Sequence, residues 1–401
     1  MTPSLARPRW LQVVRLLDPT LVRLAWPLAL MACIGLGGML LRHQSPLERI
    51  LVGFTDQVAL KTYDRLVQRV LALAASACEL RADPSDASLR AAAEDWRAAR
   101  AQWKAAAAVQ FGPAAFYNLD KQISSWPLDR PRVDQLIAEI AAGRRTLDAA
   151  ALRRMDATLR GFHAAEYLLF HDGRPRPASD LTPAELTYLA AVTQALSEDA
   201  VTLNAWWVGR ERLPAEQAAL LDAARIQTRG AYAEEFARAG QPGSRYRSRA
   251  VAVQEVFQDS VEVAEALCVR LAETLASRDP RDSDTWYSWN ALADFGQEVR
   301  SIQNAYLGRL DRVRAPSLSQ LVASRNPILD RRIKIGLADT AWQIAHFGAL
   351  YPGRQADRAL AMRVVVSSCM KMEARLEVAM GQLFPNTTGA AVDPATLFEG
   401  L

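Results

Sequence analysis

The amino-acid sequence predicts an all-α protein of 401 residues. Apolar residues recur every three or four positions over most of the chain, which is the spacing that places side chains on one face of a helix. Turn-forming residues, such as Asp83-Pro84, separate these stretches. The short β-branched run at 364–366 lies inside a helical pattern and does not predict a strand. These three observations favour helices throughout.

The same pattern and its breaks define the individual helices. The clearest start is Thr182, because a threonine N-cap is followed by Pro183 at the first helical position and by Glu185, which can complete a capping box. Long helices joined by short loops pack as antiparallel bundles. The predicted helices cover residues 46–82, 86–109, 131–142, 147–171, 182–209, 214–239, 246–278, 286–308, 316–324, 328–349 and 355–383.

This number of helices exceeds one four-helix bundle, so we expect two packed antiparallel helical-bundle domains. The predicted boundaries are residues 45–210 for the N-terminal bundle and residues 211–401 for the C-terminal bundle, after an N-terminal export leader in residues 1–44. Tryptophans early in each half hint at an internal duplication, which the sequence alone leaves open: Trp96 and Trp103 in the first, Trp286 and Trp289 in the second.

Residues 1–44 have the features of an export leader. The segment 24–41 contains no charged residue and follows an arginine-bearing stretch, which is typical of a signal peptide or a signal anchor. Residues 30–33 (LMAC) loosely resemble a lipoprotein signal, so a cleaved, an anchored and a lipidated form all remain open. The predicted location is the periplasm or cell envelope, with membrane contact only through an uncleaved leader.

The formal net charge of +4 is carried by this leader, whose five arginines face one aspartate. The rest of the chain is formally neutral. A nucleic-acid-binding domain would carry its own basic excess, so this class of protein is excluded. The other cysteines, Cys78, Cys268 and Cys369, stand among apolar neighbours without a C-x-x-C motif. We interpret them as buried small apolar side chains, with a single disulfide as the alternative.

The main functional candidate is a carboxylate in an apolar stripe. Glu166 takes one position of that stripe in the predicted helix 147–171, and His163 lies three residues earlier on the same face. Burying an unpaired charge costs several kcal/mol, so Glu166 needs a proton, a cationic partner or a metal ion. The apolar members of the stripe are Leu152, Met155, Leu159, Phe162 and Leu169.

The donor types favour iron or zinc at His163 and Glu166. Tyr167 excludes an H-x-x-E-H motif, and neither H-E-x-x-H nor a phosphate-binding loop occurs, so no catalytic residue is predicted. Further ligands would come from solvent or from other helices, where carboxylates such as Glu255, Asp259 and Asp294 are available. His346 shares a helix face with other polar residues and is a candidate for supporting the site from outside the ligand set.

Several motifs occur in a fixed order along the chain. The first is W-x7-FGP, the second is Trp126-Pro127, the third is G-x-H-x-x-E within GFHAAEYLLF, and the fourth is IQNAYLG at 302–308. In this order, in a helical chain with an export leader, they resemble the imelysin-like family of bacterial cell-envelope proteins over roughly residues 48 to 380. The residues that carry the resemblance are Trp103, Phe111, Gly112, Pro113, Gly161, His163, Glu166, Asn304 and Gly308.

The resemblance implies two helical-bundle domains with a metal site at His163 and Glu166, near the interface between them. It also implies a role in iron or haem acquisition with envelope iron-uptake components as partners. The family has in addition been labelled a metallopeptidase family. The sequence departs from many members at Ala107, where they carry a glutamate four residues after the tryptophan.

Three functions therefore follow from the sequence. The first is an exported protein that binds a metal ion, iron before zinc, or haem. The second is a zinc-dependent peptidase in which Glu166 is a ligand or a general base. The third is a non-catalytic envelope scaffold or partner-binding module in which His163 and Glu166 only bind each other.

Overall fold

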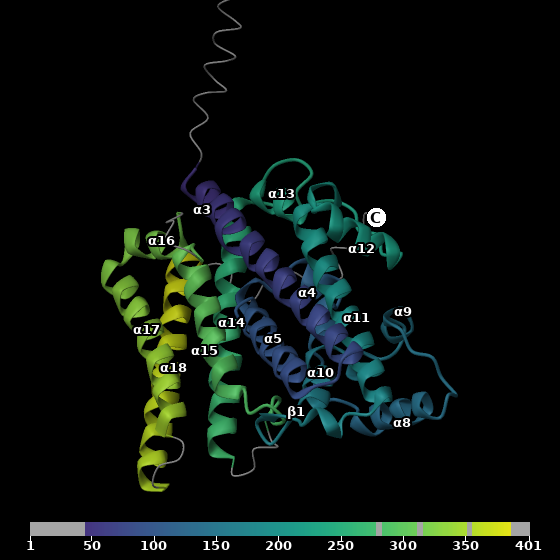
Figure 1. The fold of residues 1–401 in the computed structure, drawn as a ribbon. Coiled ribbons are helices and arrows are strands. Elements are labelled where there is room, and N and C mark those ends of the chain that lie inside the picture. Colours follow the sequence, from purple (N-terminus) through teal and green to yellow (C-terminus); the bar gives the residue numbers. More distant parts are fainter. Residues whose placement is uncertain (1–44, 278–282, 311–315, 351–354, 386–401) are drawn as a thin grey trace, which may run out of the picture. The chain divides into compact units, whose positions relative to one another are not determined.

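The computed structural model describes residues 45–277, 283–310, 316–350 and 355–385 (Figure 1). The predicted leader, residues 1–44, lies outside these ranges. Within them, none of the helices is both long and apolar enough to cross a membrane. The described part is helical almost throughout, so the all-α prediction is confirmed.

The helices of the first half begin with a long, nearly continuous segment. They are α3 (Pro46–Phe54), the π-helical turn η2 (Thr55–Ala59), α4 (Leu60–Ala82), α5 (Asp86–Lys104), the 3₁₀ turn η3 (Ala107–Val109), α6 (Pro113–Phe116), α7 (Leu119–Ile123), α8 (Arg130–Ala141), α9 (Ala149–Arg153), the 3₁₀ turn η4 (Ala157–Leu159) and α10 (Gly161–Leu169). A two-residue hairpin follows, in which β1 (Phe170–His171) pairs antiparallel with β2 (Arg174–Pro175).

The remaining elements are mostly long helices. They are the 3₁₀ turn η5 (Ala178–Asp180), α11 (Pro183–Val208), the 3₁₀ turn η6 (Arg210–Arg212), α12 (Ala215–Ala223), α13 (Tyr232–Ala237), α14 (Arg249–Ala276), α15 (Ala291–Leu307), α16 (Leu318–Arg325), α17 (Pro327–Leu350) and α18 (Gln355–Leu383). The predicted start of α11 is confirmed. The Thr182 hydroxyl accepts from the Glu185 N–H at 3.2 Å, and the Glu185 carboxylate accepts from the Thr182 N–H at 2.7 Å.

The single helix predicted over 147–171 was wrong. This segment consists of α9, η4 and α10, because Asp156 caps η4 by accepting from the Thr158 N–H at 2.9 Å. Arg160 is then extended, and Gly161, the first residue of α10, has a φ of 76°. The apolar stripe is therefore interrupted. Of its apolar members, only Phe162 and Leu169 lie on the same helix as Glu166.

The helix predicted over 214–239 was also wrong. Arg225 (φ 57°) and Gly230 (φ 78°) have left-handed backbone conformations, which divide the segment into α12 and α13. The short helices α6 and α7 lie where no helix was predicted. They are too short for apolar periodicity to mark them in the sequence.

The long helices pack in two groups. In the first, α4 packs against α5 and α11, and α10 packs against both α5 and α11. In the second, α14 packs against α15 and α18, and α17 packs against α15 and α18 (Figure 1). Contacts of α5 with α15, and of α3 with α14, join the groups. The domain boundary at 210/211 and the internal duplication stay predictions.

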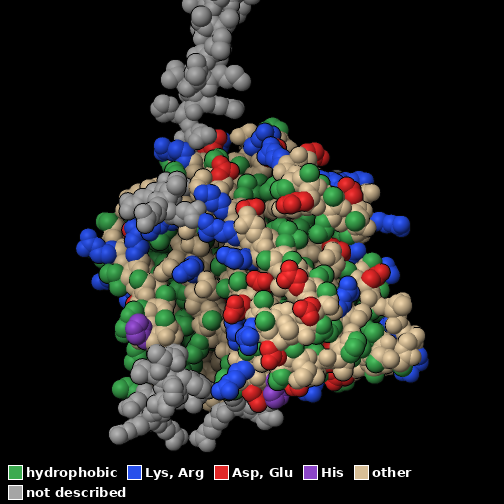
Figure 2. Space-filling model, viewed as in Figure 1, with side chains coloured by type: hydrophobic (Ala, Val, Ile, Leu, Met, Phe, Trp, Pro, Cys, Tyr) green, Lys and Arg blue, Asp and Glu red, His purple; other side chains and the backbone are tan. Residues whose placement is uncertain are grey.

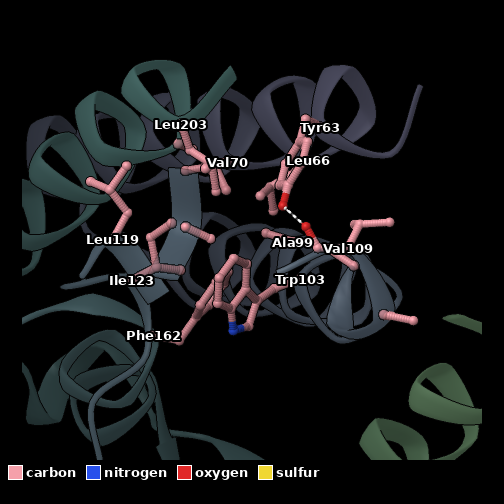
Figure 3. Packing of buried hydrophobic residues seen from close by; sticks show 14 of the residues in the cluster. Tyr63, Leu66, Val70, Ala99, Trp103, Val109, Leu119, Ile123, Phe162 and Leu203 are labelled. Carbon is pink, nitrogen blue, oxygen red and sulfur yellow. Dashed lines mark hydrogen bonds between the residues drawn. The ribbon is translucent and has the colours of Figure 1, made fainter. Parts of the chain in front are cut away.

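Four motif residues, Trp103, Phe111, Gly112 and Pro113, build the core at the end of α5. Trp103 is buried beside Ile123 and Phe162 (Figure 3). Phe111 packs against aromatic rings of α3, α11 and α13. Gly112 has a φ of 64° and lies against the Tyr232 ring, and Pro113 opens α6 at its first position. These residues therefore have structural roles.

The cysteine interpretation was wrong for Cys78, and the alternative of a single disulfide is confirmed. Cys268 of α14 and Cys369 of α18 form a disulfide with their Cα atoms 5.6 Å apart, and Cys78 is exposed rather than buried. Their apolar neighbours correctly indicated that Cys268 and Cys369 are buried. Their pairing depends on how α14 packs against α18, which local sequence does not contain.

Candidate functional site

His163 and Glu166 lie together in the interior. They are three residues apart on α10, and their exposed fractions are 2% and 0%. The His163 Nδ1 atom is 3.5 Å from Glu166 Oε2. Both of these atoms are buried without a hydrogen-bond partner. Buried polar atoms are nearly always hydrogen-bonded, so two orphaned atoms that face each other mark a candidate site.

The other carboxylate oxygen of Glu166 is held by Ser288, which lies in the turn before α15. Glu166 Oε1 accepts hydrogen bonds from the Ser288 N–H at 3.0 Å and from its hydroxyl at 2.7 Å. Burial raises the pKa of Glu166 to about 8, although both Ser288 hydrogen bonds act in the opposite direction. Since Oε1 accepts both hydrogens, the proton of the neutral acid belongs on Oε2, facing His163.

His163 is neutral in this environment. Burial lowers its pKa to about 3, and the positive charges of Arg100 and Lys104 act in the same direction. Its Nε2 atom is 3.3 Å from the Ser124 hydroxyl, and its ring lies 5.2 Å from that of Trp126. A neutral imidazole keeps a lone pair for a metal ion or a proton.

A buried ionic network surrounds the pair. Arg100 of α5 is fully buried and donates to Asp294 at 2.9 Å, to Asp284 at 3.2 Å and to the Ser124 hydroxyl at 2.7 Å. Lys104, one turn further along α5, binds Glu298 at 2.9 Å. These carboxylates are already paired with cations, so they do not complete a ligand set with His163 and Glu166.

The other predicted residues have other partners. Asp294 belongs to the ionic network, and Glu255 is placed beside Tyr246. His346 is exposed on α17, where its Nδ1–H donates to the Trp342 carbonyl at 2.9 Å and its ring stacks on Trp342. Its recorded contacts are therefore with its own helix and not with the pair.

A metal ion nevertheless fits between the two orphaned atoms. Zinc binds imidazole nitrogen and carboxylate oxygen at about 2.0–2.2 Å, so two ligands of one tetrahedral ion lie about 3.4 Å apart. The distance between His163 Nδ1 and Glu166 Oε2 is 3.5 Å. Across the described ranges, no group of three or more His, Cys, Asp or Glu side chains could hold a metal ion. Other ligands would therefore be hydroxyls or water.

Sequence reasoning missed Arg100, Ser124 and Ser288. Arg100 carried a usable signal, because it stands between Trp96 and Trp103 on the buried face of α5, just as Glu166 stands on the buried face of α10. A cation and a carboxylate at core-facing positions of two helices indicate a shared polar interior. The two serines carry no comparable signal, since they lie in turns.

Residues 59–362 match the sequence profile of the family described as Imelysin. The chain belongs to the imelysin family. A curated relative, "Iron-regulated protein A" of Synechococcus elongatus, is 26% identical over 283 residues, which cover 70% of each protein.

Two solved structures share the imelysin fold. A crystal structure described as an iron-regulated protein A precursor from Parabacteroides distasonis has a TM-score of 0.69 at 25% identity, covering 85% of this chain and 95% of the other. An imelysin-like protein from Psychrobacter arcticum has a TM-score of 0.60 at 15% identity, covering 85% and 96% of the two chains. The second likeness concerns the fold alone.

The start of α10 generates a first prediction. Gly161 has a φ of 76°, and a Cβ atom there would lie 2.4 Å from the Ile123 carbonyl oxygen. Gly161→Ala should lower the free energy of unfolding by about 2 kcal/mol or more, measured by urea denaturation. Gly143 has a similar φ of 66° with no atom within 4 Å of a Cβ, so Gly143→Ala is the matched control. Equal losses in both variants would contradict the steric argument.

The pKa of Glu166 generates a second prediction. Its folded-state pKa is raised from 4.5 to about 8, so the folded protein holds a proton that the unfolded chain releases in this range. The free energy of unfolding should fall as pH rises through this window, by at most about 1.4 kcal/mol per pH unit. Glu166→Gln does not titrate and should lose this component.

The measurement is urea denaturation of both metal-free proteins between pH 5 and pH 9. The stability of the Gln variant relative to the parent should increase up to about pH 8 and then level off. Parallel stability curves would show that Glu166 is already ionised in the folded protein at low pH.

Proposed function

We propose that this imelysin-family protein binds a metal ion, iron before zinc, through His163 and Glu166, and that it serves iron acquisition as an exported protein of the cell envelope. The observation that carries the proposal is the pair of buried, orphaned atoms 3.5 Å apart. A hydrogen bond between them would be shorter, so their separation supports metal binding over a scaffold role in which they only bind each other.

The relatives support iron as the metal. One curated relative and one solved structure are named iron-regulated protein A. Such a name refers to regulation by iron and not to binding of iron. The metal identity therefore rests on this name together with the donor chemistry, because one imidazole and one carboxylate suit iron and zinc alike.

The burial of the pair supports ion binding over the two other activities. The exposed fractions of His163 and Glu166 are 2% and 0%, so neither side chain presents a face to a porphyrin or a peptide. A haem ligand or a peptidase centre needs an open side for its large partner. A single ion with hydroxyl or water ligands needs much less space than a porphyrin or a peptide.

Metal titration tests the proposal directly. Purified full-length protein, stripped of metal, should bind one Fe²⁺ or Zn²⁺ per chain in calorimetric titration. The His163→Ala/Glu166→Ala double variant should lose this binding. His346→Ala, which changes an exposed histidine on α17, should retain it. Absence of binding to the parent protein would make the pair part of the bundle architecture and overturn the proposal.

A conservative variant separates metal binding from folding. Glu166→Gln keeps the shape of the neutral acid and an acceptor for Ser288, so at pH 7 the metal-free variant should not be less stable than the parent by more than about 1 kcal/mol. Metal binding should be abolished, because an amide is a poor ligand for iron. Thermal unfolding with and without metal measures both effects. A large loss of stability without metal would instead show that Glu166 is a structural charge.

A further inference from the structure

A second site is suggested by a cavity of about 400 Å³ between α4, the end of α5 and the C-terminal half of α15. Neither His163 nor Glu166 lines it. Its volume is in the range of small-molecule pockets. Its polar lining includes three arginines and several amides, and none of the described residues around it is acidic: Arg65, Gln102, Gln297, Arg300, Asn304 and Arg309.

The pattern of α15 explains the polar lining. Gln297, Arg300 and Asn304 follow each other at helical spacing and form one face, while Ile302 and Tyr306 lie on the buried face. The polar face contributes to the cavity because α15 packs against α5. Asn304 belongs to the IQNAYLG motif, which the metal pair does not use.

Gly308 accounts for the position of the last arginine. It ends α15 with a φ of 65°, and its N–H donates to the Asn304 carbonyl. The Arg309 N–H then donates to the same carbonyl at 3.1 Å. The chain thus turns at Gly308, and Arg309 lines the same cavity as Arg300.

Two of the three arginines around the cavity, Arg300 and Arg309, carry uncompensated positive charge. Within the described ranges, the side chains of Arg300 and Arg309 form no hydrogen bond or ion pair, whereas Arg100 and Arg270 are paired with carboxylates. Figure 2 shows several Lys and Arg side chains near α15, with Asp and Glu side chains beside them over α4. Cationic groups around a concave surface attract and orient anions.

We propose that this cavity binds a small organic anion with at least two carboxylate groups and a polar centre. From Arg300 to the end of α15 the helix rises about 10 Å, so Arg300 and Arg309 stand at different levels of the cavity. The amide of Asn304 belongs to a residue between these levels, and that of Gln297 to a residue one turn before Arg300. Each guanidinium can bind one carboxylate in a bidentate manner, and the amides can bind hydroxyl groups.

Citrate is a suitable probe, because it carries three carboxylates and one hydroxyl. Calorimetric titration of metal-free, full-length protein at low salt should show citrate binding that weakens as salt is added. Arg300→Gln/Arg309→Gln should weaken it about tenfold or more. Arg90→Gln is the matched control, because Arg90 is exposed on α5 about 18 Å along the helix from Gln102.

Further measurements separate this site from the metal pair and from simple anion binding. The His163→Ala/Glu166→Ala variant should bind citrate as the parent does, whatever its metal binding. Acetate and inorganic phosphate should bind at least about tenfold more weakly than citrate, since each reaches one arginine only. Three results would overturn the proposal: no citrate binding at millimolar concentration, equal loss in Arg90→Gln, or phosphate binding as tight as citrate binding.

Discussion

The structure around the site depends on one constraint, which is that the carboxyl group of Glu166 is fully buried. Ionisation at this depth is unfavourable, so the surroundings determine whether the group holds a proton, a cation or a metal ion. Ser288 satisfies one oxygen with two hydrogen bonds from a turn 122 residues away. This contact ties α10 to the start of α15 and leaves the second oxygen directed at His163.

The ionic network of α5 and α15 keeps other charges away from that oxygen. Arg100 and Lys104 are matched by the carboxylates of Asp294 and Glu298, which they bind at 2.9 Å. Since these charges compensate each other, neither cation neutralises Glu166 by direct contact. The result is a neutral pair, His163 and Glu166, inside a charged but balanced shell. Such a pair has a free lone pair on nitrogen, and a bound metal ion would displace the proton on oxygen.

Helix α15 has different chemistry on its different faces. Its carboxylates Asp294 and Glu298 face the cations of α5, whereas Arg300 and Asn304 face the cavity. The proposed metal pair of α10 is bound by Ser288 just before this helix, and the proposed anion cavity lies near the end of the helix. The third face of the helix is packed in the core through Ile302 and Tyr306.

The sequence by itself determined the features that depend on neighbouring residues. Helical periodicity predicted the all-α class, capping chemistry predicted the start of α11 at Thr182, and an acidic residue at a core-facing position predicted a special role for Glu166. Each of these follows from interactions within a few residues of the chain. The single helix predicted over 147–171 was wrong because Asp156 caps η4 and Gly161 has a φ of 76°, breaks that apolar periodicity does not reveal.

Only the tertiary structure decided the partners. The bond of Ser288 to Glu166, the ion pairs of Arg100 and the disulfide of Cys268 with Cys369 join residues more than 100 positions apart. Such pairings follow from which helix faces meet, and many arrangements of the same amphipathic helices satisfy the same sequence pattern. The sequence could therefore indicate that Glu166 is buried. The packing of α5, α10 and α15 decided which buried polar groups form ion pairs and which have no hydrogen-bond partner.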